Sequence, residues 1–216
     1  MGKIITVEQN KKFALLRLQT EPFGTNVYLV ICRETGESVV IDAPGDTAAI
    51  LEQLRNTKPR FILLTHGHMD HTVVLEELRT ALKVPLAAHE ADSAMMPLVP
   101  DMLLQGGELV QCGNSRLEVM HTPGHTPGSL CFRVGSLLLS GDTIFPGGPG
   151  KTWSPAGFKN IISSITEKIF ALPDDTLILP GHGESTNVKT EKELFNTFAA
   201  RKHADDLYGE VAWLGT

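Results

Sequence analysis

The sequence predicts an α/β protein in which two sheets pack face to face and helices cover the outer faces, a four-layer αββα sandwich. The main observation is that strand-like segments followed by helix-like segments occur in two successive blocks. The chain has 216 residues, of which 42% are hydrophobic and 20% charged, values typical of a soluble globular protein. No linker separates the two blocks, so we expect one domain spanning residues 1–216.

In the first half, runs of β-branched and apolar residues bounded by turn residues indicate strands. Apolar residues recurring with helical spacing indicate two helices, the first of which ends before Pro59. The predicted strands are 12–18, 26–32, 37–42, 61–64 and 85–88. The predicted helices are 46–58 and about 71–82.

The second half repeats this plan, with more strands before the helices begin. The predicted strands are 108–111, 117–121, 129–134, 136–140 and 177–179. The predicted helices are about 156–171 and about 188–207. Two such blocks account for two sheets with helices outside.

The run Thr65–His71 places three imidazoles and a carboxylate directly after a predicted buried strand. Such nitrogen and oxygen ligands suit zinc, iron or manganese. Side chains two apart in an extended chain point the same way, so His66 and His68 can bind one ion. Asp70 and His71 diverge from that pair where the next helix begins, so they can serve a second ion.

Three further candidate ligands follow predicted strands, each in a turn bracketed by glycine: His125, Asp142 and His182. Glycine allows tight turns, so each strand can present one side chain at its end. The complete set fits two ions about 3.5 to 4 Å apart. We expect His66, His68 and His125 on the first ion. We expect Asp70, His71 and His182 on the second, with Asp142 bridging both.

The predicted cofactors are therefore two divalent metal ions, with Zn²⁺ preferred and iron or manganese also compatible with these ligands. A bridging water with its pKa lowered toward about 7 supplies hydroxide for attack on a carbonyl carbon. Asp70 is also the candidate catalytic residue.

The seven ligands, in order and spacing, resemble those of the metallo-β-lactamase superfamily over roughly residues 12–185. The resemblance implies an αββα sandwich with its site along one edge of the two sheets. The segments around His125, Asp142 and His182 look most like the glyoxalase II (hydroxyacylglutathione hydrolase) branch, whose members hydrolyse acylglutathione thioesters. The bridging aspartate differs from true β-lactamases, which commonly have cysteine there. The implied function is a dinuclear thioesterase acting on a thioester or related small carbonyl ester.

Residues outside the ligand set are expected to support it. Asp42 resembles a family aspartate that buttresses the metal ligands, and an acceptor for a ligand imidazole makes physical sense there. Thr65 and Thr143 are expected to orient their neighbours.

Three residues are candidates for substrate binding. Lys151 resembles a lysine that helps to bind glutathione in glyoxalase II, and Trp153 can contact an apolar group. Glu184 stands where that branch has a tyrosine, and an acidic group there repels glutathione carboxylates. The sequence ends near residue 216 without the C-terminal glutathione-binding extension of the branch.

Three alternatives remain open at this point. A persulfide dioxygenase of the same superfamily uses one iron, here on His66, His125 and Asp142. A lactonase is less favoured, because Phe145 lacks the hydroxyl of the tyrosine that lactonases of this fold often have there. A non-catalytic metal-binding module of the same fold is the third.

The composition also excludes some partners. The formal net charge is −6 and the Lys and Arg residues are scattered, which argues against nucleic acid. No segment approaches the roughly 20 apolar residues that span a bilayer, and the amino-terminal residues 1–12 lack the continuous apolar core of a signal peptide. We expect a cytoplasmic protein that binds a small-molecule thioester or ester and no membrane. The sequence leaves the oligomeric state open.

Overall fold

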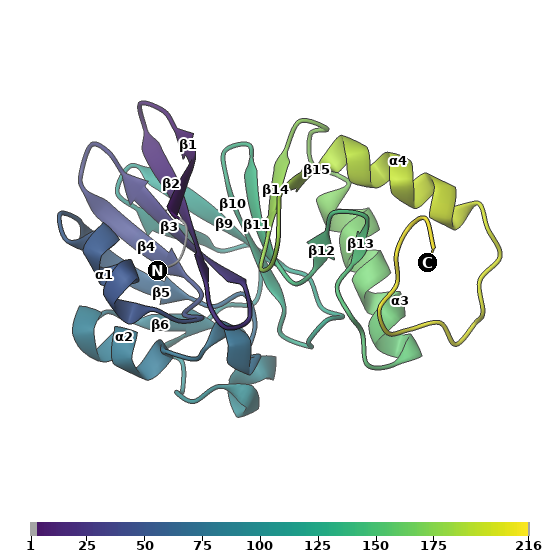
Figure 1. Ribbon diagram of the computed structural model, residues 1–216, viewed down its shortest axis with the longest axis horizontal. Coiled ribbons are helices and arrows are strands. Elements are labelled where there is room, and N and C mark those ends of the chain that lie inside the picture. Colours follow the sequence, from purple (N-terminus) through teal and green to yellow (C-terminus); the bar gives the residue numbers. More distant parts are fainter. Residues whose placement is uncertain (1–3, 216) are drawn as a thin grey trace.

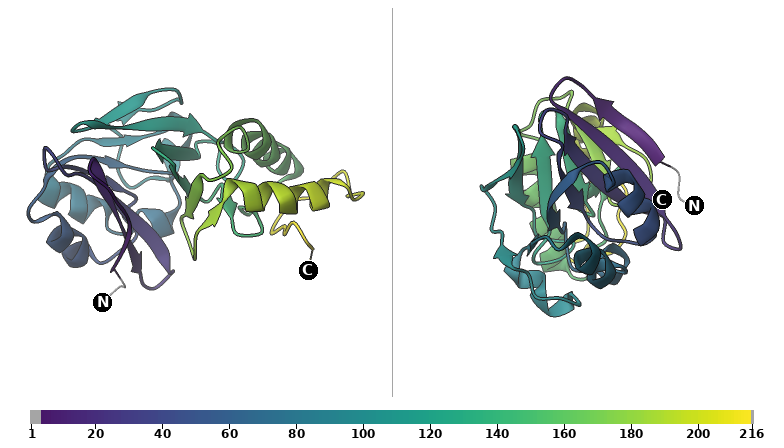
Figure 2. Two further views of the ribbon diagram at one scale, coloured as in Figure 1. Left: turned by 90° about the horizontal axis from the view of Figure 1, so that it is seen from above. Right: turned by 90° about the vertical axis from the view of Figure 1, so that its left-hand side faces the viewer.

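The computed structural model describes residues 4–215 and contains two sheets between two pairs of helices (Figure 1). Helices α1 (Thr47–Leu54) and α2 (Leu75–Leu82) lie outside the first sheet. Helices α3 (Pro155–Ser164) and α4 (Val188–Ala199) lie outside the second, and Figure 2 shows the same layers from two further directions. The predicted four-layer αββα sandwich is confirmed.

The first sheet has seven strands in sequence order, and its later strands run parallel to one another. They are β1 (Ile4–Gln9), β2 (Phe13–Thr20), β3 (Thr25–Cys32), β4 (Glu37–Ile41), β5 (Lys58–Leu63), β6 (Leu86–Ala88) and β7 (Met102–Leu103). The sequence analysis missed β1 and β7. Both are edge strands, and β7 has only two residues.

The second sheet has six strands in the order β15-β14-β11-β10-β9-β8. They are β8 (Leu109–Cys112), β9 (Ser115–His121), β10 (Leu130–Val134), β11 (Leu137–Gly141), β14 (Leu177–Pro180) and β15 (Thr186–Asn187). Strands β12 (Ile144–Phe145) and β13 (Gly148–Pro149) form a separate small hairpin. Every predicted strand is present, with ends that differ by a few residues.

The predicted helices differ mainly at their ends. The first ends at Leu54, because Lys58 and Pro59 already pair with β4. The second begins at Leu75, because residues 69–71 form a separate 3-10 turn. Helix α3 continues as a π-helical turn over Ile165–Ile169.

Helix α4 ends at Ala199 and not near residue 207 as predicted. Beyond it the chain turns back, because His203 Nε2 lies 2.7 Å from the carbonyl oxygen of Phe198 and the His203 ring stacks on the Phe198 ring. The His203 side chain thus forms a hydrogen bond with a backbone carbonyl group that the end of the helix leaves unpaired.

None of the helices in the described part of the chain is long and apolar enough to cross a membrane.

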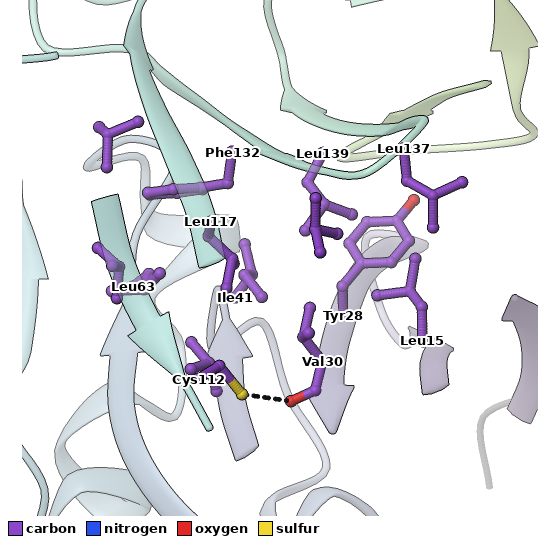
Figure 3. Close-up of a cluster of buried hydrophobic side chains, with 14 of the residues drawn as sticks. Leu15, Tyr28, Val30, Ile41, Leu63, Cys112, Leu117, Phe132, Leu137 and Leu139 are labelled. Atoms are coloured by element: carbon purple, nitrogen blue, oxygen red, sulfur yellow. Dashed lines mark hydrogen bonds between the residues drawn. The ribbon is translucent and has the colours of Figure 1, made fainter. Parts of the chain in front are cut away.

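Three hydrophobic clusters separate the four layers. The inner cluster lies between the sheets and joins residues of both, such as Leu63 of β5 and Phe132 of β10 (Figure 3). Strand β4 shows the alternation that this arrangement requires. Val39 and Ile41 face the inner cluster, whereas Val40 faces α1 and α2.

Residues 200–215, which we call the C-terminal tail, fold back beside the β12–β13 hairpin (Figure 1). Trp213 holds the tail in place, since it is fully buried against Phe195 and Phe198. Its Nε1 donates a hydrogen bond to Glu191 Oε2 at 2.8 Å. Glu191 is itself buried and also accepts from the backbone N–H of Gly147. The tail is thus tied to α4 and to the hairpin.

Replacing Trp213 by Ala should lower the free energy of unfolding by about 3–5 kcal/mol, because it leaves a cavity and removes one hydrogen bond from a buried carboxylate. Urea unfolding followed by circular dichroism measures this loss. The matched control is Trp153→Ala, since Trp153 is 63% exposed. Its effect should stay within about 1 kcal/mol. Equal losses for both variants would contradict the proposed anchor.

Candidate metal centre

All of the predicted ligands follow the carboxyl ends of strands. His66, His68, Asp70 and His71 follow β5, His125 follows β9, Asp142 follows β11 and His182 follows β14. Strands β9 and β11 both run antiparallel to β10, and β14 runs parallel to β11, so their carboxyl ends share one edge of the sheet. The two sheets thus bring all seven side chains to one edge of the sandwich.

The side chains form three overlapping groups whose ligand atoms lie within 4.8 Å of one another. The groups are His66, His68 and His125; His66, His71 and Asp142; and Asp70, His71 and His182. The first and third contain the residues expected around the two ions.

Asp142 lies between the first and the third of these groups. Its Oδ1 is 3.4 Å from His71 Nε2, and its Oδ2 is 3.6 Å from the Nε2 atoms of both His125 and His182. Within the first group, His68 Nδ1 lies 2.9 Å from His125 Nε2. Within the third group, His182 Nε2 lies 3.0 Å from Asp70 Oδ2. One carboxylate therefore touches both groups, as a bridging ligand must.

Hydrogen bonds on the far side of three rings set which nitrogen faces the centre. The Nδ1 atom of His71 lies 2.8 Å from Asp42 Oδ2, that of His66 lies 3.0 Å from Thr65 Oγ1, and that of His125 lies 2.8 Å from the Lys151 carbonyl oxygen. Their Nε2 atoms are left to act as ligands.

Three buried atoms at the centre have no hydrogen-bond partner within residues 4–215: His66 Nε2, His71 Nε2 and Asp142 Oδ1. Buried polar atoms without a partner are costly and uncommon in folded proteins. Cations held by the two ligand groups would satisfy all three. The residues present therefore fit a metal centre with imidazole and carboxylate ligands.

The pKa shifts of the ligand histidines differ from one side of the centre to the other. Burial, then the neighbouring imidazoles, lowers the pKa of His66 well below its ordinary value. Burial also lowers the pKa of His68. Burial acts in the same direction on His71, but the charges of Asp42 and Asp142 outweigh it and raise its pKa well above the ordinary value. In the metal-free protein, His66 and His68 are thus ready to bind a cation, whereas His71 must release a proton.

The two carboxylates are held in the ionised form. The hydrogen bond from His182 lowers the pKa of Asp70 to about 2. Burial raises the pKa of Asp142, but His71 and the other imidazoles outweigh it and lower the pKa overall. Both groups therefore carry the negative charge that a divalent cation needs at neutral pH.

Asp42 supports the ligands from behind. It is almost completely buried, and its Oδ1 accepts from the Thr65 backbone N–H at 2.8 Å. Its Oδ2 accepts from Thr65 Oγ1 and contacts His71 Nδ1, each at 2.8 Å. Thr143 lies elsewhere: its hydroxyl is 3.0 Å from Thr122 Oγ1, and within residues 4–215 it makes no hydrogen bond to a ligand side chain. It therefore stabilises the strand ends and not the ligands directly.

Asp92 is a buried residue that the sequence analysis missed. Its Oδ2 accepts from the Gly67 backbone N–H at 3.0 Å and from Thr126 Oγ1 at 2.7 Å. Its Oδ1 accepts from the Gly128 backbone N–H at 2.7 Å. One carboxylate thus joins the loop of His66 and His68 to the loop of His125. No motif marks it, because it is an isolated aspartate in a polar segment.

Side chains of the first sheet hold the loop that carries His182. Asn26 Nδ2 donates to the carbonyl oxygens of Pro180 and Gly183, and Tyr28 OH donates to that of Pro180. Arg17 donates to the Gly183 carbonyl at 3.0 Å. The sequence analysis assigned no role to these three residues.

Glu184, a candidate for substrate binding, lies 3.2 Å from Arg17 Nη2. Its carboxylate therefore forms an ion pair with Arg17 of β2.

Gly181, next to His182, has no space for a side chain, because a Cβ there would collide with Asp142 Oδ1 and the His71 ring.

A cleft of about 430 Å³ opens beside His125 and Asp142. One wall contains Phe145 and Lys151, as expected for the loop after β11, and the other is Glu210–Ala212 of the C-terminal tail. Trp153 is exposed near the cleft, with its ring centroid 6.4 Å from that of His68. The tail was missed because helix was predicted to residue 207.

Comparison with known proteins agrees with this geometry. The family model described as "Metallo-beta-lactamase superfamily" matches residues 20–182. The chain belongs to the metallo-β-lactamase superfamily. This superfamily match covers strands β3 to β14 and every proposed ligand.

Relatives with known sequences include the "Probable metallo-hydrolase YqgX" of Bacillus subtilis, 33% identical over 82% of this chain and 93% of that protein. The "Hydroxyacylglutathione hydrolase GloC" of Haemophilus influenzae is 29% identical over 72% of this chain and 84% of its own length. These similarities support a metallo-hydrolase.

Two solved structures are similar in fold. The BLEG-1 B3 metallo-β-lactamase has a TM-score of 0.76 and 27% identity, covering 83% of this chain and 96% of that one. The protein TTHA1623, solved in a di-iron-bound form, has a TM-score of 0.70 and 28% identity, covering 82% of this chain and 96% of that one.

Replacing Asp92 by Asn should lower metal affinity about 10- to 100-fold, because an amide cannot accept all three hydrogen bonds and the two ligand loops separate. Competition with a chelating dye measures the affinity. Glu90→Gln is the matched control, since Glu90 is an exposed acid two residues away. Equal affinity in the Asp92 variant and the control would show that the loops do not depend on this carboxylate.

Proposed function

We propose that this chain is a hydrolase of thioesters or related small carbonyl esters that uses two divalent metal ions, with zinc preferred. The observation that carries the proposal is the position of Asp142, which lies within 3.6 Å of histidines from both ligand groups. A structural metal site has four protein ligands and leaves no coordination position open for water or substrate. Two adjoining groups that share one carboxylate are instead typical of two-metal hydrolytic centres.

The ligand roles follow from the groups already described. His66, His68 and His125 would hold one ion, Asp70, His71 and His182 the other, and Asp142 both. When bound, such ions act as Lewis acids and lower the pKa of a water toward about 7.

The remaining residues position the reactants. Asp42 keeps the His71 ring in place and, through Thr65, the His66 ring. Asp70 stays ionised at neutral pH and its side chain is 27% exposed, so it can accept a hydrogen bond from the attacking water. This is the catalytic role that we propose for Asp70 in addition to metal binding.

The substrate class is supported by similarity and by the cleft. The Haemophilus influenzae relative is named as a hydroxyacylglutathione hydrolase, which acts on a thioester. Phe145 and Pro149 offer an apolar surface beside the metal ligands, and Lys151 offers a charge at its rim. A small acyl group can therefore reach the centre while the thiol part extends toward Lys151 and Trp153.

Metal removal tests the proposal. The purified protein should contain two divalent ions per chain and release thiol from simple thioesters faster than it opens lactones. Dialysis against a chelator should abolish turnover, and added Zn²⁺ should restore it. Metal analysis and a thiol-reactive chromophore measure the two quantities.

Three outcomes would overturn it. Full turnover by metal-free protein would exclude metal-dependent hydrolysis. One iron per chain with oxygen uptake would indicate a dioxygenase instead. Metal content without turnover on thioesters, esters and lactones would indicate a non-catalytic module.

Replacing Asp142 by Ala should lower kcat/KM by more than about 100-fold and reduce the metal content, since both ligand groups lose a shared carboxylate. Asp175→Ala is the matched control, because Asp175 is an exposed acid in the turn before β14, whereas His182 follows the other end of that strand. Thermal unfolding of both metal-free variants distinguishes a folding defect from a lost ligand. Normal turnover by folded Asp142→Ala protein would refute the bridging role.

A further inference from the structure

The rim of the cleft contains a lysine that is already paired with an acid. Lys151 Nζ lies 3.2 Å from Glu210 Oε1, and the two side chains are 43% and 81% exposed. Lys151 is the only Lys or Arg among the residues that line the cleft. Its Nζ also lies 5.0 Å from the centroid of the Trp153 ring. Any anionic group of a substrate that approaches Lys151 therefore meets the Glu210 carboxylate as well.

The backbone on both sides of Glu210 is attached to the loop that carries Lys151. Gly209 N–H donates to Thr152 Oγ1 at 3.2 Å, and Thr152 N–H donates to the Gly209 carbonyl at 3.1 Å. Trp213 N–H donates to the Gly147 carbonyl at 2.8 Å. The buried Trp213 side chain anchors the same segment. The fold thus holds Glu210 opposite Lys151 even though the carboxylate itself is exposed.

An exposed ion pair contributes little to stability, but it changes which ligands bind. Without Glu210, Lys151 would attract a carboxylate or phosphate on the thiol part of a substrate. With Glu210 in place, such an anionic group must displace the Glu210 carboxylate from Lys151 and then remain close to that negative charge. A neutral thiol part escapes this repulsion, and a cationic one is attracted to Glu210.

Resting on the hydrolase function proposed above, we propose that Glu210 is a specificity-determining residue that selects against thioesters of anionic thiols. The preferred substrates are thioesters whose thiol part is neutral or carries an ammonium group. This selection acts at the cleft rim and leaves the metal ligands untouched.

Three acetyl thioesters test this inference on the metal-loaded protein: S-acetylglutathione as the anion, S-acetyl-N-acetylcysteamine as the neutral reference and acetylthiocholine as the cation. The wild-type kcat/KM should rank the cation and the neutral thioester above the anion. In Glu210→Gln, the ratio of kcat/KM for the anion to that for the neutral thioester should rise roughly threefold to tenfold. The ratio for the cation should fall, and 0.5 M salt should reduce both changes.

A binding measurement separates this inference from the proposed function. S-methylglutathione cannot be hydrolysed, and its binding near Lys151 should alter the fluorescence of the exposed Trp153. We expect its Kd to fall roughly threefold to tenfold in Glu210→Gln. Asp206→Asn, an exposed acid of the C-terminal tail outside the cleft lining, should leave the Kd and the ratios as in wild type.

The outcomes are distinguishable. If wild-type protein hydrolyses none of the three thioesters, the proposed function fails, while the fluorescence titration still tests Glu210. If turnover is normal but neither the ratios nor the Kd change in Glu210→Gln, the inference about Glu210 is wrong. It is also wrong if Glu210→Gln weakens binding of S-methylglutathione, since Glu210 then attracts the ligand.

Discussion

The hydrogen bonds of the Asp42 carboxylate are the constraint on which the metal centre depends. Strands β4 and β5 are parallel neighbours, so Asp42 at the end of β4 lies beside Thr65 at the end of β5. This one carboxylate binds the Thr65 backbone and hydroxyl and the His71 ring, and Thr65 in turn contacts the His66 ring. A buried carboxylate is tolerated only when its oxygens have such partners. Strand pairing in the first sheet therefore determines the orientation of a ligand from each group.

The centre also requires both sheets to be docked. The first sheet supplies the ligands after β5, and the second supplies His125, Asp142 and His182. The inner hydrophobic cluster sets their separation, and the Leu130 N–H of the second sheet donates directly to the Thr65 carbonyl after β5 at 2.7 Å. Asp92 and Asn26 then join loops of one sheet to loops of the other. Because buried ligand atoms without a partner destabilise the metal-free fold, a cation that binds them stabilises the docked sheets.

The sequence analysis predicted best what local patterns encode. Strand positions follow from apolar runs, and the ligands stand out because histidine and aspartate follow those runs in glycine-bracketed turns. Asp92 and Arg17 were missed because each is a single polar residue whose role depends on contacts far along the chain. Glu184 was considered for substrate binding from its place after the last histidine, but its partner Arg17 lies on β2, which no local spacing indicates. The end of the first helix was misplaced for the same reason, since it is decided by the pairing of Lys58 and Pro59 with β4.

The two parts of the site are built under different constraints. The metal ligands are held by buried hydrogen bonds that reach both sheets, so few substitutions there leave the geometry intact. The cleft rim is instead formed by exposed side chains on the loop after β11 and on a tail without regular structure. The tail is anchored by the buried pair of Trp213 and Glu191, whose side chains do not line the cleft. Substitutions at the rim can therefore change the charge of the favoured substrate while the anchor and the metal centre stay as they are.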